Sequence, residues 1–147
     1  MRQVIPLIQE ILCPGSVALV SIYGSNENRY AGFTRICYAD TDLYATIEHE
    51  KLETDILVGL GGAAATERKF GTFDLGAKGD IGEVFRIIHS LNEDSCFNGF
   101  NLYDYNSDRS DILVHSHEIV AATEANRYFR KVKQIIAENM DKLEILD

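Results

Sequence analysis

The sequence predicts a mainly helical fold with a small β-hairpin, an α+β class, in one domain spanning residues 1–147. Apolar residues recur at helical spacing in long segments, and β-branched residues gather in short runs near the N-terminus. No linker or internal repeat divides the chain. Hydrophobic residues make up 46% of the sequence and charged residues 25%, which is typical of a globular protein with a packed core.

The first expected element is a short apolar helix over residues 3–13. Pro6 fits only in its first turn, because a proline deeper inside a helix removes a backbone hydrogen bond. Pro14 and Gly15 follow the last apolar residue and end the helix. The N-terminus is therefore expected to begin with a helix of about three turns.

A β-hairpin is expected next, from strands over residues 17–23 and 30–38. The first run is β-branched and apolar, and the second alternates in part. A cluster of turn residues over 24–28 joins them. Gly32 lies inside the second strand, where glycine often marks a bulge or a close backbone contact.

A second helix is expected from Thr46, which suits the N-cap position. Gly59, Gly61 and Gly62 lie inside its helical pattern, and each costs about 1 kcal/mol relative to alanine. Close approach of a neighbouring helix is the simplest compensation. One face of this helix carries the expected core residues, namely Leu52, Ile56, Leu60 and Ala63 or Ala64.

Two more helices are expected in the C-terminal half. Residues 71–79 indicate a loop, residues 80–91 a helix, and residues 92–110 an irregular connection. Ser116 is the expected N-cap of the last helix. This long helix must pack on the domain or on another subunit, through the stripe Ile119, Val120, Tyr128, Phe129, Val132, Ile135, Ile136, Met140 and Leu143.

Charge and composition exclude several classes of partner. Fourteen basic against twenty-three acidic residues give a net charge of -9, which repels nucleic acid. No apolar run is long enough to span a membrane. The apolar run at the start of the chain is also too short for a secretion signal. Cys13, Cys37 and Cys96 are expected to be buried, reduced thiols. We therefore expect a cytoplasmic protein.

The histidines and Asp80 are the residues that invite a metal-site hypothesis. His115 and His117 flank Ser116, but a zinc protease needs His-Glu-x-x-His, and the second histidine of that spacing is absent after His117. Because a helix is expected to start between them, the simpler interpretation is solvated histidines at a helix N-terminus. Asp80 opens a helix after a glycine-rich loop, where N-cap or first-turn placement explains it. His89 is expected at the edge of the core.

The central part of the chain resembles a family signature. Residues 60–71 read Leu-Gly-Gly-Ala-Ala-Ala-Thr-Glu-Arg-Lys-Phe-Gly, similar to the Leu-Gly-Gly-Arg-Ala-Ala-Glu-Glu and Phe-Gly signature of FtsH-type ATP-dependent zinc metalloproteases. Residues 76–80, Gly-Ala-Lys-Gly-Asp, look like the family's Gly-Ala-Ser-Asn-Asp. Residues 125–143 look like its closing helix. The resemblance covers the family's peptidase domain and not its ATPase.

This resemblance implies a mainly helical domain that forms rings and holds zinc through His-Glu-x-x-His and a downstream Asp. Asp80 matches the third-ligand position. Counted back from Pro14, the motif falls on residues 2–6 and is degenerate. Arg2 replaces the first His, Gln3 the catalytic Glu and Pro6 the second His. None of these three residues can supply the lost ligands or the general base.

We therefore expect a non-catalytic pseudoprotease that acts as an interaction, assembly or binding module, without a metal or other cofactor. An alternative is a metal-dependent hydrolase whose zinc is held by Asp80 together with His115, His117 or His89. A third is a small-molecule-binding domain that uses the degenerate cleft. The long last helix and the family's rings both predict a homo-oligomer, and a protein partner is also expected.

Overall fold

The computed structural model describes residues 4–21, 23, 33–37, 47–72, 75–94 and 111–142. Most of this part is helical, with one two-stranded antiparallel hairpin, so the expected fold class is confirmed. The elements in chain order are α1 (Val4–Leu12), β1 (Val17–Ser21), β2 (Phe33–Ile36), α2 (Ile47–Phe70), a short 3-10 helix (Leu75–Ala77), α3 (Lys78–Asp94) and α4 (Asp111–Glu138).

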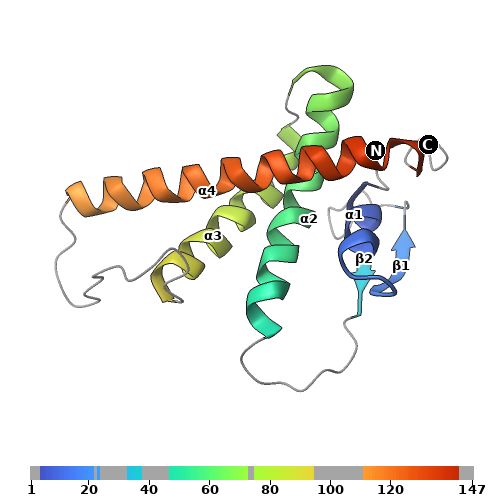
Figure 1. Ribbon diagram of the computed structural model, residues 1–147, viewed down its shortest axis with the longest axis horizontal. Coiled ribbons are helices and arrows are strands. Elements are labelled where there is room, and N and C mark those ends of the chain that lie inside the picture. Colours follow the sequence, from blue (N-terminus) through green and yellow to red (C-terminus); the bar gives the residue numbers. More distant parts are fainter. Residues whose placement is uncertain are drawn as a thin grey trace.

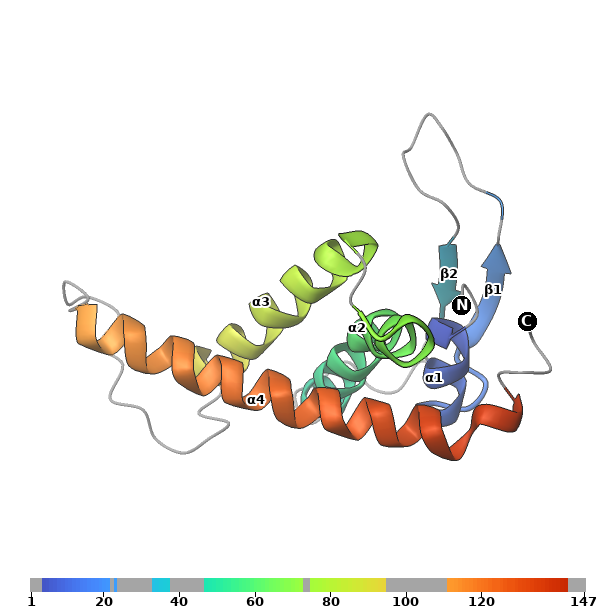
Figure 2. The same cartoon turned by 90° about the horizontal axis from the view of Figure 1, so that it is seen from above.

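Helix α2 lies at the centre of the described fold, and α4 runs across both α2 and α3 (Figure 1). A Cβ atom at Gly59 would lie 2.7 Å from Cγ2 of Val84 in α3, and one at Gly61 would lie 2.5 Å from Cδ1 of Ile8 in α1. Residues two apart on a helix point in nearly opposite directions. Helix α2 therefore lies between α1 and α3 (Figure 2).

The expected reason for the glycines is confirmed at Gly59 and Gly61, where a neighbouring helix occupies the space of a side chain. The same expectation is wrong at Gly62, because nothing lies within 4 Å of the position that its Cβ would take. Gly62 therefore destabilises the helix relative to alanine, and no close helix contact compensates for this loss of stability.

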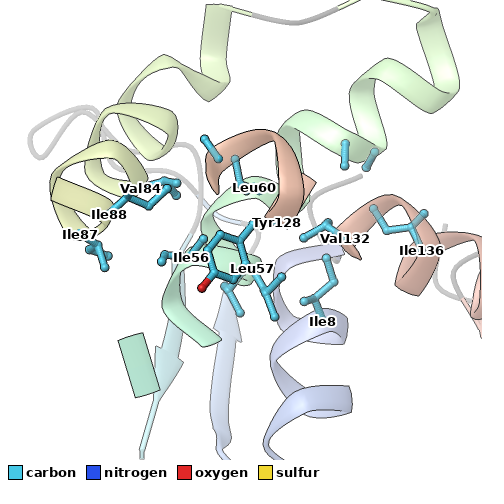
Figure 3. Close-up of a cluster of buried hydrophobic side chains, with 14 of the residues drawn as sticks. Ile8, Ile56, Leu57, Leu60, Val84, Ile87, Ile88, Tyr128, Val132 and Ile136 are labelled. Carbon is cyan, nitrogen blue, oxygen red and sulfur yellow. The ribbon is translucent and has the colours of Figure 1, made fainter. Parts of the chain in front are cut away.

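The core lies where the four helices meet (Figure 3). Tyr128 of α4 points into this cluster beside Ile56 and Leu57 of α2. The expected apolar face of α2 is confirmed, since Ile56, Leu60, Ala63 and Ala64 are buried and Leu52 is half-buried. The largest fully buried side chains are Ile8, Ile56, Ile88, Gln9, Val84 and Val132.

The N-terminal elements follow the expected order. Gly15 adopts a φ of +79° after α1, as expected for a helix ended by a proline and a glycine. Ser21 pairs with Phe33 in the hairpin, and the register shifts between Val17 and Leu19. Both strands are shorter than the expected ranges, because Tyr23 and Cys37 lie outside them; Gly32 and Thr46 fall outside the described residues.

Several expected helix boundaries are wrong. Helix α4 begins at Asp111, so Ser116 lies inside it and not at the N-cap. Extending an established helix costs little, since each added residue gains one hydrogen bond. Helix α3 begins at Lys78 and continues through Asp94, so residues 78–79 and 92–94 are helical where a loop was expected. Residues 95–110 lie outside the described part of the chain.

The apolar stripe of α4 is confirmed only from its middle onward. Tyr128, Val132 and Ile136 are buried. Ile119 and Val120 are exposed instead; among residues 114–142, whose burial is described, the first buried residue is Ala121. Phe129, Ile135 and Met140 are half-buried against the core, and Leu143 lies outside the described residues.

Candidate functional site

Pro6 lies in the first turn of α1, as expected, and it is buried. Its side chain has no atom that can bind a metal. Arg2 and Gln3, the other positions that the resemblance assigns to the lost motif, lie outside the described residues. Of the three positions that carry the ligands and the base in the family's motif, the structure thus describes one, and that one is a packing residue.

Asp80 lies in the first turn of α3, as expected for an acidic residue near the positive end of a helix. Its backbone oxygen is 3.7 Å from the position of a Cβ at Gly59, which places the start of α3 against α2. The residue is exposed overall. Partial burial of its carboxyl group nevertheless raises the pKa of Asp80 above its ordinary value.

His115 and His117 both lie inside α4, so the expectation that a helix starts between them is wrong. Residues two apart on a helix diverge; His115 is exposed and His117 is half-buried. His89 of α3 places Nε2 3.7 Å from Oε1 of Glu118 in α4. This pair links the two helices only when the histidine is protonated.

These residues do not assemble into a metal site. Among the residues that the structure describes, no three His, Cys, Asp or Glu side chains are grouped closely enough to hold a metal ion. Asp80, His89, His115 and His117 all belong to that described set. The geometry therefore does not bring together the ligands of the alternative hydrolase hypothesis.

The cysteines differ from expectation. Cys37 is exposed and Cys13 is half-buried, and both are free thiols. The expectation of buried thiols is wrong for Cys37, because it follows the short strand β2 at the surface. Sγ of Cys13 lies 4.0 Å from Oγ1 of Thr54 in α2. Cys96 falls outside the described residues.

Two buried polar contacts were not foreseen from the sequence. Gln9 of α1 is fully buried and donates a 2.9 Å hydrogen bond from Nε2 to Oγ of Ser16. The hydroxyl of Tyr128 donates one of 2.9 Å to Oε1 of Glu53. The first contact ties α1 to the connection that follows it, and the second joins α4 to α2. Gln9 within an apolar run was the only sign of the first contact in the sequence.

Two hollows adjoin α4 on the described surface. The first has a volume of about 240 Å³ and lies between α2, α3 and α4. The second has a volume of about 270 Å³ and lies between the end of α2 and α4, where Lys133 pairs with Glu67 at 2.8 Å. The first is lined by Leu60, Ala63, Ile81, Phe85, Ala122, Ala125, Asn126 and Phe129, and the second by Ala64, Glu67, Arg68, Gly71, Lys133 and Ile136.

Comparison with known proteins does not assign the chain to a family. No protein-family model matches it, and no curated protein matches it. Within the described residues, none of the helices has the length and apolar character needed to cross a membrane.

Proposed function

We propose that this chain is an FtsH-peptidase-like domain without a working zinc site, which acts as a non-catalytic interaction or assembly module in the cytoplasm. One observation carries the proposal. Pro6 stands where the resemblance requires the second zinc-binding His, and it is buried in α1 without a ligand atom.

The packing of the matched segment supports a retained fold. Leu60 and Ala64, both in the segment that resembles the family signature, are buried in α2. Gly61 of the same segment receives Ile8 of α1. A segment that serves packing can persist after the chemistry of a site is lost, because fold and function are separable.

The chemistry of the remaining residues supports a non-catalytic role. A catalytic zinc site needs three protein ligands and an open position for water. Asp80 supplies one carboxylate, and the described residues place no second and third ligand beside it. Without a Lewis acid or a general base, the water that hydrolysis requires is not activated.

Self-association is part of the proposal. The first turns of α4 expose Val114, Ile119 and Val120, which are 42%, 55% and 37% accessible. These three side chains do not share one face of the helix, and singly exposed apolar residues are common on monomers, so the proposed self-association rests on the resemblance to a ring-forming family. Light scattering over a wide concentration range tests this role: a mass of at least two chains is expected, and a monomer throughout contradicts it.

A peptidase assay tests the proposed loss of catalysis. Fluorescently labelled casein is incubated with the chain, with and without added zinc, alongside an Asp80→Ala variant. We expect cleavage at the background level in every sample. Zinc-dependent cleavage that a chelator stops and Asp80→Ala abolishes would contradict the proposal and favour the rearranged hydrolase.

A further inference from the structure

The apolar hollow between α2, α3 and α4 has the size of one bulky side chain. Its volume is about 240 Å³, and its lining includes Leu60, Phe85, Ala122 and Phe129. An apolar cavity of about 150 Å³ is large enough for benzene, whereas pockets for drug-sized ligands begin at about 300 Å³. The hollow therefore suits a single aromatic or aliphatic side chain better than a whole small molecule.

Cationic side chains adjoin this hollow on the next turn of α4. Arg130 follows Asn126 by four residues and Lys133 follows Phe129 by four, so each cation lies beside a residue that lines the hollow. Nζ of Lys133 is 5.5 Å from the centroid of the Phe129 ring. Apolar and cationic surface thus form one continuous strip along α4.

The second hollow extends the cationic surface to α2. Lys133 and Arg68 both line it. The carboxylate of Glu67 lies 2.8 Å from Lys133 and offsets that cation. Arg68 and Arg130 are exposed, and Arg68 lines this hollow together with Lys133. We call the apolar hollow together with Arg68, Arg130 and Lys133 the α4 groove.

The charge of the whole chain restricts what the α4 groove can bind. The net charge is -9, so a long polyanion or an anionic membrane is repelled wherever it extends beyond the groove. A short acidic segment experiences mainly the local cations, because charges farther away than about 8 Å are largely screened at physiological salt. The charge balance therefore favours a short acidic peptide segment.

We propose that the α4 groove binds a short segment of a partner protein in which a bulky apolar side chain lies beside acidic residues. The apolar side chain occupies the hollow, and the carboxylates face Arg130, Lys133 and Arg68. This inference rests on the proposed role of the chain as an interaction module. It assigns that role a surface and a partner chemistry.

The test begins with a random peptide library displayed on phage and selected against the purified chain. We expect the enriched peptides to share an aromatic or large aliphatic residue next to Asp or Glu. One enriched peptide is then synthesised with a fluorescent label, and its affinity is measured by anisotropy. Replacing its acidic residues by Lys is expected to abolish binding.

Matched variants test the surface itself. Ala122→Phe fills the hollow, and Arg130→Glu reverses the charge of one cation. Each substitution is expected to lower the affinity for the synthetic peptide about tenfold. Ala122→Ser leaves the hollow open, and Lys131→Glu makes the charge change at an exposed position of α4 that does not line the hollow. These two controls are expected to bind within about twofold of the original chain, and thermal melts verify that all four variants fold.

The contradicting results are distinct. Enrichment of no peptide, of peptides without acidic residues, or of peptides that bind both groove variants normally would overturn the groove assignment. Loss of self-association in Ala122→Phe would identify a second copy as the occupant, and loss of RNA or anionic-vesicle binding in Arg130→Glu would identify a polyanion. Zinc-dependent peptidase activity would instead contradict the proposed function, whatever the peptides do.

Discussion

The hydroxyl of Tyr128 in α4 donates a 2.9 Å hydrogen bond to Oε1 of Glu53 in α2. Tyr128 is only 2% exposed. Burial, followed by the hydrogen bond to the Glu53 carboxylate, raises the pKa of the Tyr128 hydroxyl well above its ordinary value. The longest helix is therefore joined to the central helix by a polar contact at the edge of the core.

Tyr128→Phe keeps the ring in the core and removes this hydrogen bond. Because a hydrogen bond to a charged group contributes about 1.5–3 kcal/mol and this one is only partly buried, we expect the free energy of unfolding to fall by about 1–2 kcal/mol. Urea denaturation measures the change. Tyr23→Phe is the control, since Tyr23 is 82% exposed, and an equal loss in that variant would contradict the account.

Alkaline pH is expected to weaken the fold through the same tyrosine. Its folded-state pKa is raised, whereas an unfolded tyrosine titrates near about 10. The stabilising contribution is therefore complete below pH 10 and is lost as the pH rises through the folded-state pKa. Unfolding free energies measured between about pH 9 and 11 should fall less steeply in Tyr128→Phe than in the original chain; identical slopes would refute this.

The tight contact between Gly61 and Ile8 predicts opposite effects at neighbouring glycines. Gly61→Ala places a methyl group 2.5 Å from Cδ1 of Ile8, and such overpacking costs about 1–3 kcal/mol. Gly62→Ala meets no atom within 4 Å and should stabilise the helix by up to about 1 kcal/mol. Thermal melts of the two variants distinguish them.

A double variant tests whether Ile8 is the cause. Ile8→Val shortens the side chain that meets position 61, so it should reduce the cost of Gly61→Ala. Contacting residues are expected to show such non-additivity. Additive effects of the two substitutions would contradict the packing of α1 on α2 that the structure describes.

Asp80→Asn distinguishes a solvated carboxylate from a metal ligand. Burial raises the pKa of Asp80, so its contribution to stability is present below the unfolded pKa and is lost as the pH rises through the folded pKa. Removing the charge also removes its interaction with the positive end of α3, so the two effects offset and the amide variant should stay within about 0.5 kcal/mol of the original chain at pH 7. A large loss of stability together with release of zinc would show that Asp80 is a metal ligand and would contradict the proposed loss of the zinc site.

Glu83→Gln is the control on the same helix, because the pKa of Glu83 is shifted in the direction opposite to that of Asp80. The hydrogen bond from Arg86, 2.9 Å from Nε to Oε2, lowers the pKa of Glu83. Its contribution to stability is therefore present above the unfolded pKa and is lost as the pH falls through the folded pKa. Stability at neutral pH should decrease in Glu83→Gln, in contrast to Asp80→Asn.

The sequence was sufficient for the fold class because its strongest signals are local. Apolar periodicity gave the buried face of α2, and the costly glycines predicted close packing that Gly59 and Gly61 show. The start of α4 was not predictable from Ser116, because a good N-cap residue does not stop a helix that propagation extends. Ile119 is exposed because its part of α4 lies beyond the core. The local sequence pattern does not reveal where along α4 the contact with the core begins.

The candidate site was less predictable because its parts come from separate helices. Asp80 was correctly expected in the first turn of a helix. The adjacency of Lys133 and Arg68 depends on how α4 crosses α2, so spacing within either helix does not reveal it. The hydrogen bond between Tyr128 and Glu53 joins residues 75 positions apart and is equally invisible in the sequence.

The zinc content of the purified chain tests directly whether the zinc site has been lost. The protein is purified without added metal and without a metal-affinity resin, and zinc per chain is measured by atomic spectrometry after dialysis. We expect a zinc content far below one atom per chain. One tightly held zinc per chain, lost on substitution of Asp80 or of the histidines, would contradict it.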